Sequence, residues 1–352
     1  MADYAFLVLP SHNRVYARSA VALVRAELGV FNTTALGGRV RDVAETVIGG
    51  VPYITFSLDG AREADLDRLA NLSSLYALYA VEGGLLRPVT LNRLDTFGSD
   101  LLTIQKYAGK TNEDFTKLLV NVTAMTCDPD ALLGRRLRLL DPMCGRGTTL
   151  NQALMYGLDS AGVDVDKKDF DAYSAFIRTW LKNNRFKHQA ATVPVRRDRT
   201  TIGRRLDVTV GATKEAYRGG DTIALSMVNA DTLESAAFFK RESFDLIVTD
   251  APYGVQHAAR PGGRGGRGDA GRALSRRPLD LLRAAVPVWA GLLRPGGAIG
   301  ISWNTYVAKR EELAGVLEDN GFAVCDSEPY LGLRHRVDQA IIRDVVVAKR
   351  PG

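Results

Sequence analysis

The sequence is poor in cysteine and histidine, the side chains that most often bind transition metals or form cross-links. Its 352 residues include three cysteines and four histidines. Cys127, Cys144 and Cys325 lie far apart and show neither metal-ligand spacing nor a disulfide framework. The sequence therefore predicts no metal site, and it favours a reducing compartment over an oxidising one.

Long apolar runs are also missing. No stretch approaches the roughly 20 apolar residues that a membrane-spanning helix needs. The chain begins MADYAFLVLP, with no basic region ahead of its apolar positions, so we expect no signal peptide. Together these absences predict a cytoplasmic protein with no membrane partner.

What the chain does contain is enough apolar sequence for a large core. Hydrophobic residues make up 46%, and the length favours one large domain with a smaller one beside it. The formal net charge is +6, which is compatible with a polyanionic partner but does not prove one.

Two stretches about a hundred residues apart carry the strongest signals. The first, Leu137–Leu150, reads LRLLDPMCGRGTTL: an apolar run typical of a buried strand, then a glycine turn at 144–147, then a helix beginning near Thr148. The second, Phe244–Gly254, reads FDLIVTDAPYG and predicts another buried strand that ends in Asp250-Ala251-Pro252-Tyr253.

Acidic residues follow the predicted strands of this region. Asp141 ends the first strand, Asp164 ends the second with Asp166 close behind, and Asp231 follows the third. In an open α/β sheet, ligands bind at the carboxyl ends of the parallel strands. The spacing therefore predicts that these acids share one ligand-binding edge.

The two motifs together resemble those of class I S-adenosylmethionine (SAM) dependent methyltransferases that act on an amino nitrogen. Asp-Pro-Met-Cys-Gly-Arg-Gly-Thr with Asp-Ala-Pro-Tyr-Gly is similar to the tRNA guanine-N2 methyltransferase group, the THUMP-associated enzymes with a DPPY-type motif. The resemblance covers residues 104–352 well and the N-terminal part loosely. It implies SAM as the cofactor and direct methyl transfer without a metal.

The resemblance also implies roles for the loop and the acids. The loop would allow its backbone to approach the amino-acid and ribose portions of SAM closely. The acids would contact the ammonium group, the ribose hydroxyls and the adenine amino group of SAM. The loop residues are Cys144, Gly145, Gly147 and Thr148; the acids are Asp141 for the ammonium, Asp164 or Asp166 for the ribose, and Asp231 for the adenine.

For the substrate, the resemblance assigns catalysis to the second motif. An exocyclic amino group is a poor nucleophile because its lone pair is delocalised. The side chain of Asp250 and the carbonyl of Ala251 would accept its two hydrogens, Pro252 would shape the turn, and Tyr253 would stack on the planar substrate. Many relatives have a proline at the position of Ala251.

The predicted fold class is α/β, a Rossmann-like seven-stranded class I methyltransferase sheet with a smaller ferredoxin-like α+β domain before it. Residues 101–352 alternate strand and helix, as a doubly wound sheet requires. Residues 1–100 show the strand–helix–strand–strand–helix–strand order of a ferredoxin-like unit. That unit either packs as an appendage or presents the substrate.

Basic segments suggest where a polyanion would bind. Insertions at 188–220 and 258–277 are rich in arginine, and the second follows the Asp250 motif directly. We interpret the second as a phosphate-contacting loop, against the alternative of a solvated linker. Its substrate-binding candidates are Arg260, Arg264, Arg267, Arg276 and Arg277.

Two further segments have open roles. In amino-methyltransferases a segment before the glycine strand often lies over the methionine end of SAM, and Lys106, Tyr107 and Thr111 are the candidates here. The alternative is an ordinary entry helix. Near the C-terminus, His335 and Arg343 either hold a phosphate with their neighbours or belong to a solvated edge.

The interpretation that the sequence favours is a methyltransferase whose partner is structured RNA, with tRNA as the leading class. A DNA or small-molecule amino-methyltransferase is the alternative enzyme, and an RNA-binding protein with a relic fold is the alternative without activity. The sequence does not indicate the oligomeric state.

Overall fold

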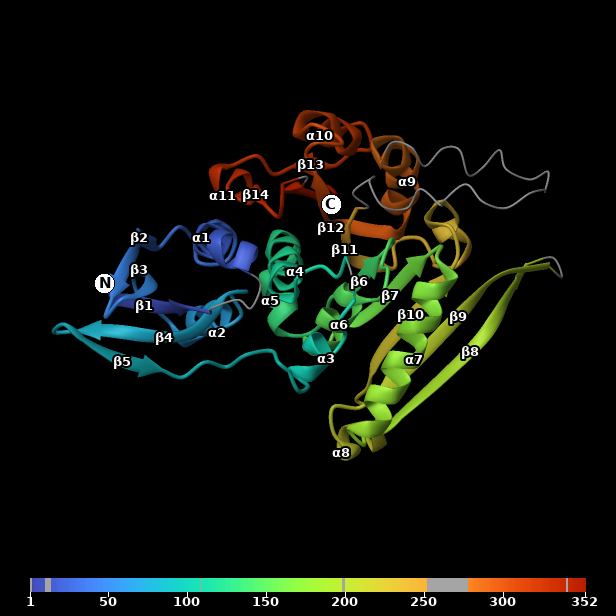
Figure 1. The fold of residues 1–352 in the computed structure, drawn as a ribbon, viewed down its shortest axis with the longest axis horizontal. Helices are drawn as coiled ribbons and strands as arrows, with labels where there is room; N and C mark the ends of the chain where they lie inside the picture. Colours follow the sequence, from blue (N-terminus) through green and yellow to red (C-terminus); the bar gives the residue numbers. More distant parts are fainter. Residues whose placement is uncertain (1, 10–13, 108, 198–199, 252–277, 340) are drawn as a thin grey trace.

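The computed structural model describes residues 2–9, 14–107, 109–197, 200–251, 278–339 and 341–352. It contains two β-sheets, one built from the N-terminal residues and one from the rest of the chain, with helices packed between and around them (Figure 1). Among the described residues, none of the helices combines the length and the apolar character that a membrane span requires.

The N-terminal sheet has five antiparallel strands in the order β2-β3-β1-β4-β5. Its elements follow the expected strand–helix–strand–strand–helix–strand order, and a fifth strand comes after them. They are β1 (Ala2–Val8), α1 (Arg14–Thr34), β2 (Val40–Ile48), β3 (Val51–Leu58), α2 (Glu63–Leu69), β4 (Leu75–Glu82) and β5 (Leu85–Val89).

The second sheet has ten strands in the order β13-β15-β12-β11-β6-β7-β10-β9-β8, with β14 paired to β15. Its first half comprises α3 (Asp100–Thr103), α4 (Glu113–Cys127), α5 (Pro129–Leu133), β6 (Arg138–Asp141), α6 (Thr148–Met155), β7 (Asp159–Asp164), α7 (Lys167–Asn183), β8 (His188–Arg197), β9 (Thr200–Val210), α8 (Lys214–Arg218) and β10 (Ile223–Asn229). The second half comprises η1 (Thr232–Ala237), β11 (Phe244–Asp250), α9 (Pro278–Leu292), β12 (Leu293–Asn304), α10 (Arg310–Glu318), β13 (Ala323–Val324), α11 (Glu328–Leu331), β14 (His335–Arg336) and β15 (Ile342–Lys349).

Strands β12, β11, β6, β7 and β10 run parallel, so their carboxyl ends share one edge. With the antiparallel β15 and β13 they form the seven strands of a class I methyltransferase sheet. The other three are β14 and the hairpin β8–β9, the latter formed by the first basic insertion. Strand β13 is short, because only Ala323 and Val324 pair with β15.

Buried side chains alternate between the two faces of this sheet. Val345 and Val347 of β15 pack with α4 on one face, whereas Val346 and Ala348 pack with α9 and α10 on the other. Helices α6 and α7 cover β7 and β10. Both faces are therefore covered, as a mainly parallel sheet requires.

Local sequence explains where two of the helices near the site begin. The side chain of Asn112 accepts a hydrogen bond from the backbone N–H of Phe115 and caps α4. Asp166 caps α7 in the same way through the N–H of Lys168. These caps satisfy backbone donors that a helix start leaves without partners.

A buried polar network joins the N-terminal sheet to the second one. The fully buried Glu27 of α1 accepts hydrogen bonds from Ser73 and from the side-chain amide of Asn121 on α4, at 2.6 and 2.7 Å. Asn121 in turn accepts one from the hydroxyl of Tyr156, after α6, at 2.7 Å. The two sheets are thus linked through α4 by polar contacts as well as by a continuous apolar cluster.

Candidate active site

The glycine loop between β6 and α6 has a backbone that only glycine accommodates at one position. Gly147 has φ +76°, and a Cβ there would lie 2.3 Å from a ring carbon of Tyr173. Gly145 also has positive φ, +49°, but apart from its chain neighbours no heavy atom of the described residues stands within 4 Å of the position that a Cβ would occupy there. The loop is tied to the next strand by Cys144, whose N–H donates to the carbonyl of Val163 at 3.0 Å.

Two of the predicted acids are desolvated and lie against this loop. Asp164 accepts hydrogen bonds from the N–H groups of Gly145 at 2.7 Å and Asp166 at 2.8 Å, and burial raises the pKa of its carboxyl. Asp141 is 3% exposed; burial raises its pKa to about 7, and the nearby charge of Asp164 adds to the rise. Hydrogen bonds from the Met143 N–H and from Thr149 oppose the shift in pKa.

The other two acids are more exposed and act as helix caps. Asp166 accepts from the N–H of Lys168 at 2.7 Å, and Asp231 accepts from the N–H of Leu233 at 2.9 Å to begin η1. Asp231 follows β10 and Asp166 follows β7, so both lie at the carboxyl edge of the sheet with Asp141 and Asp164. The structure therefore brings the four predicted acids to one edge.

Asp250, at the end of β11, receives three side-chain donors from distant parts of the chain. Thr111 donates to its Oδ2 at 2.7 Å, and Ser302 of β12 donates to its Oδ1 at 2.8 Å. A guanidinium nitrogen of Arg343 on β15 lies 3.4 Å from Oδ2. The next residue, Ala251, is buried and its N–H donates to the carbonyl of Ser302 at 2.8 Å.

Arg343 is held from a second side by aromatic packing. Its guanidinium carbon lies 4.3 Å from the ring centroid of Phe115, and its side chain is 5% exposed. His335, opposite Arg343 on β14, packs 5.1 Å from the same ring, and burial together with the charge of Arg343 lowers its pKa to about 4. Both residues are buried, so neither the phosphate contact nor the solvated edge suggested by the sequence applies to them.

The segment before α4 lies against both motifs. The hydroxyl of Tyr107 is 3.2 Å from that of Thr148, and the guanidinium of Arg146 stands 4.7 Å over the Tyr107 ring. Thr111 reaches Asp250, as described above, whereas Lys106 is exposed. This segment bridges the glycine loop and the Asp250 motif.

Several predicted site residues lie outside the described residues. These are Pro252, Tyr253, Arg260, Arg264, Arg267, Arg276 and Arg277. Sequence reasoning missed Ser302 and the contact of Arg343 with Asp250. No local motif marks either residue; only the register of β12 and β15 beside β11 brings them there.

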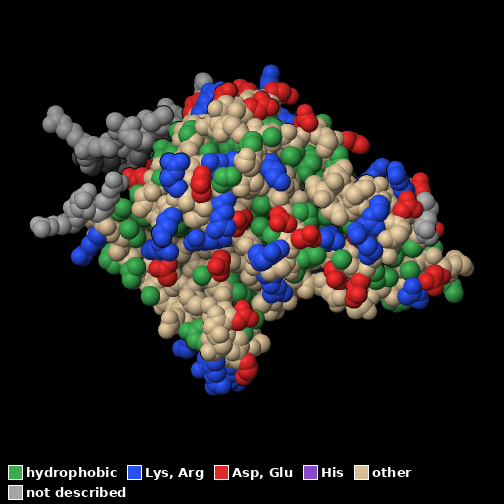
Figure 2. Space-filling model, turned by 180° about the vertical axis from the view of Figure 1, so that it is seen from behind, with side chains coloured by type: hydrophobic (Ala, Val, Ile, Leu, Met, Phe, Trp, Pro, Cys, Tyr) green, Lys and Arg blue, Asp and Glu red, His purple; other side chains and the backbone are tan. Residues whose placement is uncertain are grey.

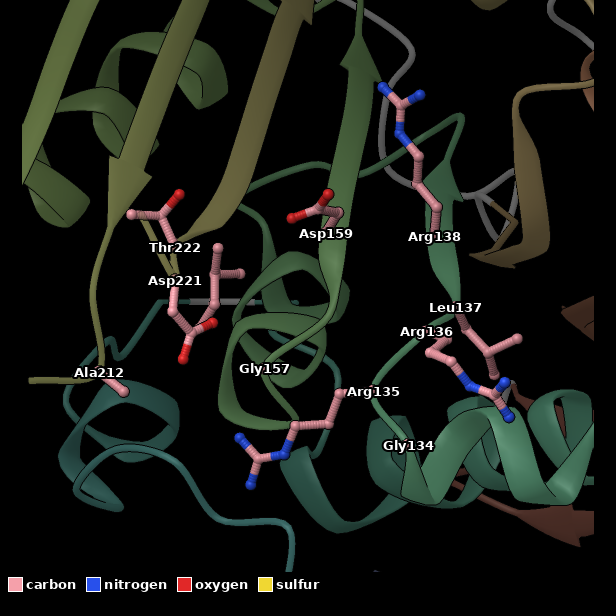
Figure 3. Close-up of a pocket in the computed structure, with 11 residues that line it drawn as sticks. Gly134, Arg135, Arg136, Leu137, Arg138, Gly157, Asp159, Ala212, Asp221 and Thr222 are labelled. Atoms are coloured by element: carbon pink, nitrogen blue, oxygen red, sulfur yellow. The ribbon is translucent and has the colours of Figure 1, made fainter. Parts of the chain in front are cut away.

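A surface groove of about 560 Å³ lies at the opposite edge of the sheet (Figure 3). It is formed around the amino ends of β6, β7 and β10. Arg135, Arg136 and Arg138 line it, but their guanidinium groups point apart, so they do not converge on one ligand. No group of three or more potential metal ligands occurs among the described residues.

The mainly parallel sheet and the glycine loop after β6 fit the class I SAM-dependent methyltransferase fold. Residues 131–262 match the family described as UPF0020: RMKL-like, methyltransferase domain. The match spans the glycine loop, the four acids and the Asp250 motif. The chain is a SAM-dependent methyltransferase.

Comparison with curated protein sequences finds no significant match. Among solved structures, the chain is similar to a TehB-like SAM-dependent methyltransferase from Corynebacterium glutamicum, with 16% identity, 63% of this chain and 84% of that chain covered, and a TM-score of 0.35. It is also similar to the Thermus thermophilus 16S rRNA N2 G1207 methyltransferase RsmC, with 19% identity, 88% and 58% covered, and a TM-score of 0.36. At these TM-scores neither similarity indicates a substrate.

The residues of the carboxyl edge fit SAM. Among the described residues, no Lys or Arg forms an ion pair with Asp141 or Asp164, and burial disfavours the charged form of both carboxyls. A ligand that carries positive charge would compensate these two carboxylates, and SAM has an ammonium and a sulfonium. The positive φ of Gly145, with open space beside it, leaves room for such a ligand against the backbone.

Proposed function

We propose that this methyltransferase acts on an exocyclic amino nitrogen of a base in structured RNA, and that the substrate is guanine N2 in tRNA. The observation that carries the proposal is the arrangement around Asp250. Thr111, Ser302 and Arg343 hold its carboxylate at the tip of β11, directly before Ala251-Pro252-Tyr253. SAM, when bound, supplies an electrophilic methyl group.

The chain's own residues would prepare the nitrogen for attack. A fixed carboxylate accepts one amino hydrogen, the Ala251 carbonyl accepts the other, and the nitrogen lone pair is thereby directed away from the base ring. Because Thr111, Ser302 and Arg343 fix the carboxylate of Asp250, we assign it the role of hydrogen-bond acceptor, and the proton that the methylated nitrogen loses passes to solvent. The rest of the rate acceleration comes from holding the methyl donor and the accepting nitrogen in line.

Flipping a base out of a duplex costs a few kcal/mol, so we expect the target to lie in a loop or at an unpaired position. Tyr253 would stack on the base, which contributes roughly 1–3 kcal/mol. The five arginines of the second insertion would contact the phosphates nearby.

We further propose that residues 1–100 form a ferredoxin-like accessory domain and residues 101–352 the catalytic domain. The order of elements and the antiparallel pairing support this division. Residues 1–100 contain nine Lys and Arg against eleven Asp and Glu, which argues against direct contact with RNA. The hydrogen bond between Glu27 and Asn121 supports instead a role in holding α4. The free cysteines of the described residues support a location in the cytoplasm.

The test is methyl transfer from labelled SAM to deproteinised total tRNA, with ribosomal RNA, duplex DNA and a small-metabolite extract in parallel. We expect label in tRNA, recovered as N2-methylguanosine after digestion to nucleosides. Label only in DNA or only in the metabolite fraction would contradict the proposal. Label in ribosomal RNA alone would support the proposed reaction but identify ribosomal RNA, rather than tRNA, as the substrate.

A further inference from the structure

Two segments of the chain carry an excess of positive charge: residues 167–220 and the insertion at 258–277, which has six Arg against one Asp. Residues 167–220 contain thirteen Lys and Arg against five Asp and Glu, a net charge of +8. The rest of the chain contains 33 basic and 35 acidic residues, a net charge of −2. Apart from the insertion at 258–277, the excess of positive charge therefore belongs to the elements of residues 167–220, α7, β8, β9 and α8, which we call the basic arm.

Side-chain contacts fasten the helix of the arm to its hairpin. Arg178 of α7 donates to the carbonyl of Ala190 and to the hydroxyl of Thr192 on β8, both at 2.8 Å. Arg204 of β9 forms an ion pair with Asp171 of α7 at 2.8 Å and lies over the ring of Phe170. The arm is thus one structural unit along the side of the sheet (Figure 1).

One end of the basic arm extends beyond the carboxyl edge of the sheet. The last residue of β10, Asn229, pairs with Arg204, so residues 200–203 of β9 continue past the end of β10. Four residues of a strand span about 13 Å. Figure 1 shows β8 and β9 reaching past the ends of β7 and β10.

The opposite end carries a cluster of basic side chains, which we call the distal cluster. All its members are exposed, and none has a carboxylate partner among the described residues. They are Lys182, Arg185, Lys187, Lys214 and Arg218. Figure 2 shows Lys and Arg side chains gathered on the lowest part of the molecule, the part that α8 forms in Figure 1.

The length of α7 sets the distance between the two ends. A helix of 17 residues is about 25 Å long. A nucleoside held at Asp250 cannot reach the distal cluster, whereas a folded polynucleotide can contact both. Phosphates at regular spacing match exposed, unpaired cations, because binding releases the counterions that surround a nucleic acid.

We propose that the basic arm is the docking surface for the phosphate backbone of the substrate RNA, and that the substrate is therefore a folded RNA that extends at least the length of α7 from the reacting base. This inference rests on the proposed function. It assigns recognition to a surface about 25 Å long, separate from the residues that position the amino group.

The test compares two full-length triple variants with the same loss of charge. The arm variant is Lys182→Ala/Lys187→Ala/Lys214→Ala. The control is Arg136→Ala/Lys240→Ala/Arg241→Ala, three exposed cations at the amino-terminal edge of the sheet that also have no carboxylate partner among the described residues. Affinity for deproteinised tRNA is measured between about 50 and 200 mM salt, and affinity for SAM by calorimetry.

We expect the arm variant to bind tRNA roughly tenfold to a hundredfold more weakly at about 150 mM salt, with a salt dependence reduced by about 2 in the log–log slope. SAM affinity and turnover with guanosine should equal those of the wild type, and the control should bind tRNA as the wild type does.

Equal tRNA affinity of the two variants overturns the docking surface. Arm-dependent affinity for duplex DNA but not for tRNA would overturn its assignment to RNA. Wild-type protein that binds tRNA through the arm yet methylates no RNA would contradict the proposed function instead.

Discussion

Thr111 and Asp250 are separated by 139 residues, yet the hydroxyl of the first donates to the carboxylate of the second at 2.7 Å. Thr111 stands just before Asn112, the cap of α4, and the same segment contacts the glycine loop through Tyr107. One short segment therefore links the cofactor loop to the proposed acceptor of the amino hydrogen.

Thr111→Val should lower kcat by about tenfold, because a hydrogen bond to a charged group contributes about 1.5–3 kcal/mol. SAM affinity should be unchanged, since Thr111 contacts Asp250 rather than the two buried acids. Thr111→Ser, which keeps the hydroxyl, is the matched control. Wild-type kcat in Thr111→Val, or a loss in Thr111→Ser as large as that in Thr111→Val, would contradict the role assigned to the hydrogen bond.

Arg343→Met should lower the free energy of unfolding by about 3 kcal/mol, because it removes one partner of a buried ion pair. Urea denaturation measures this change. Arg283→Met is the surface control: its pair with Asp280 is half exposed, so its loss should cost less than about 1 kcal/mol. A similar cost for the two substitutions would contradict the importance assigned to Arg343.

Because the pKa of Asp141 is raised to about 7, the stability of the ligand-free protein should decrease as the pH rises toward 7. The folded, ligand-free protein holds a proton on Asp141 at pH values where the unfolded chain has lost it. This contribution to stability is therefore present below the ordinary carboxyl pKa and is lost as the pH rises toward 7.

SAM binding should show the opposite trend, since its positive groups favour the ionised carboxyl. We expect SAM affinity to fall as the pH decreases below about 7, and binding under mildly acidic conditions to release protons. Calorimetry in two buffers of different ionisation enthalpy measures that release. Asp141→Asn should reduce the release, leaving the share of Asp164, whose pKa burial also raises; equal release by the variant and the wild type would contradict the role of Asp141.

Gly147→Ala should destabilise the protein by about 3 kcal/mol, because a left-handed backbone and a clash with Tyr173 add together. Gly145→Ala, with positive φ but open space, should cost only about 1 kcal/mol. Thermal and urea unfolding distinguish the two. Equal costs would mean that the contact with Tyr173 relaxes freely.

Much of the fold could be predicted because its signals are local. The apolar run before Asp141, the glycines after it and the apolar run before Asp250 each indicate their own strand or turn, and the carboxyl edge follows from parallel pairing. The helical spacing of Phe115, Leu118 and Leu119 likewise predicts the inward face of α4, and all three are buried.

The partners of Asp250 could not be predicted, because they depend on which strands become neighbours. Ser302 and Arg343 reach the carboxylate only through the register of β12 with β11 and of β15 with β12. The basic insertion at 188–220 can be recognised by composition. That it forms an arm fastened to α7 depends on contacts such as that of Arg178 with β8, for which the sequence has no signature.

The central claim is that Asp250 positions an amino group of RNA for methyl transfer. The most direct test is the single-turnover rate of methyl transfer to tRNA by wild-type protein and by Asp250→Ala, with SAM affinity measured for both. The account predicts N2-methylguanosine formed by the wild type, a loss of at least a hundredfold in the variant (on the order of 3 kcal/mol), and equal SAM affinity. A variant that methylates tRNA at the wild-type rate would contradict the claim.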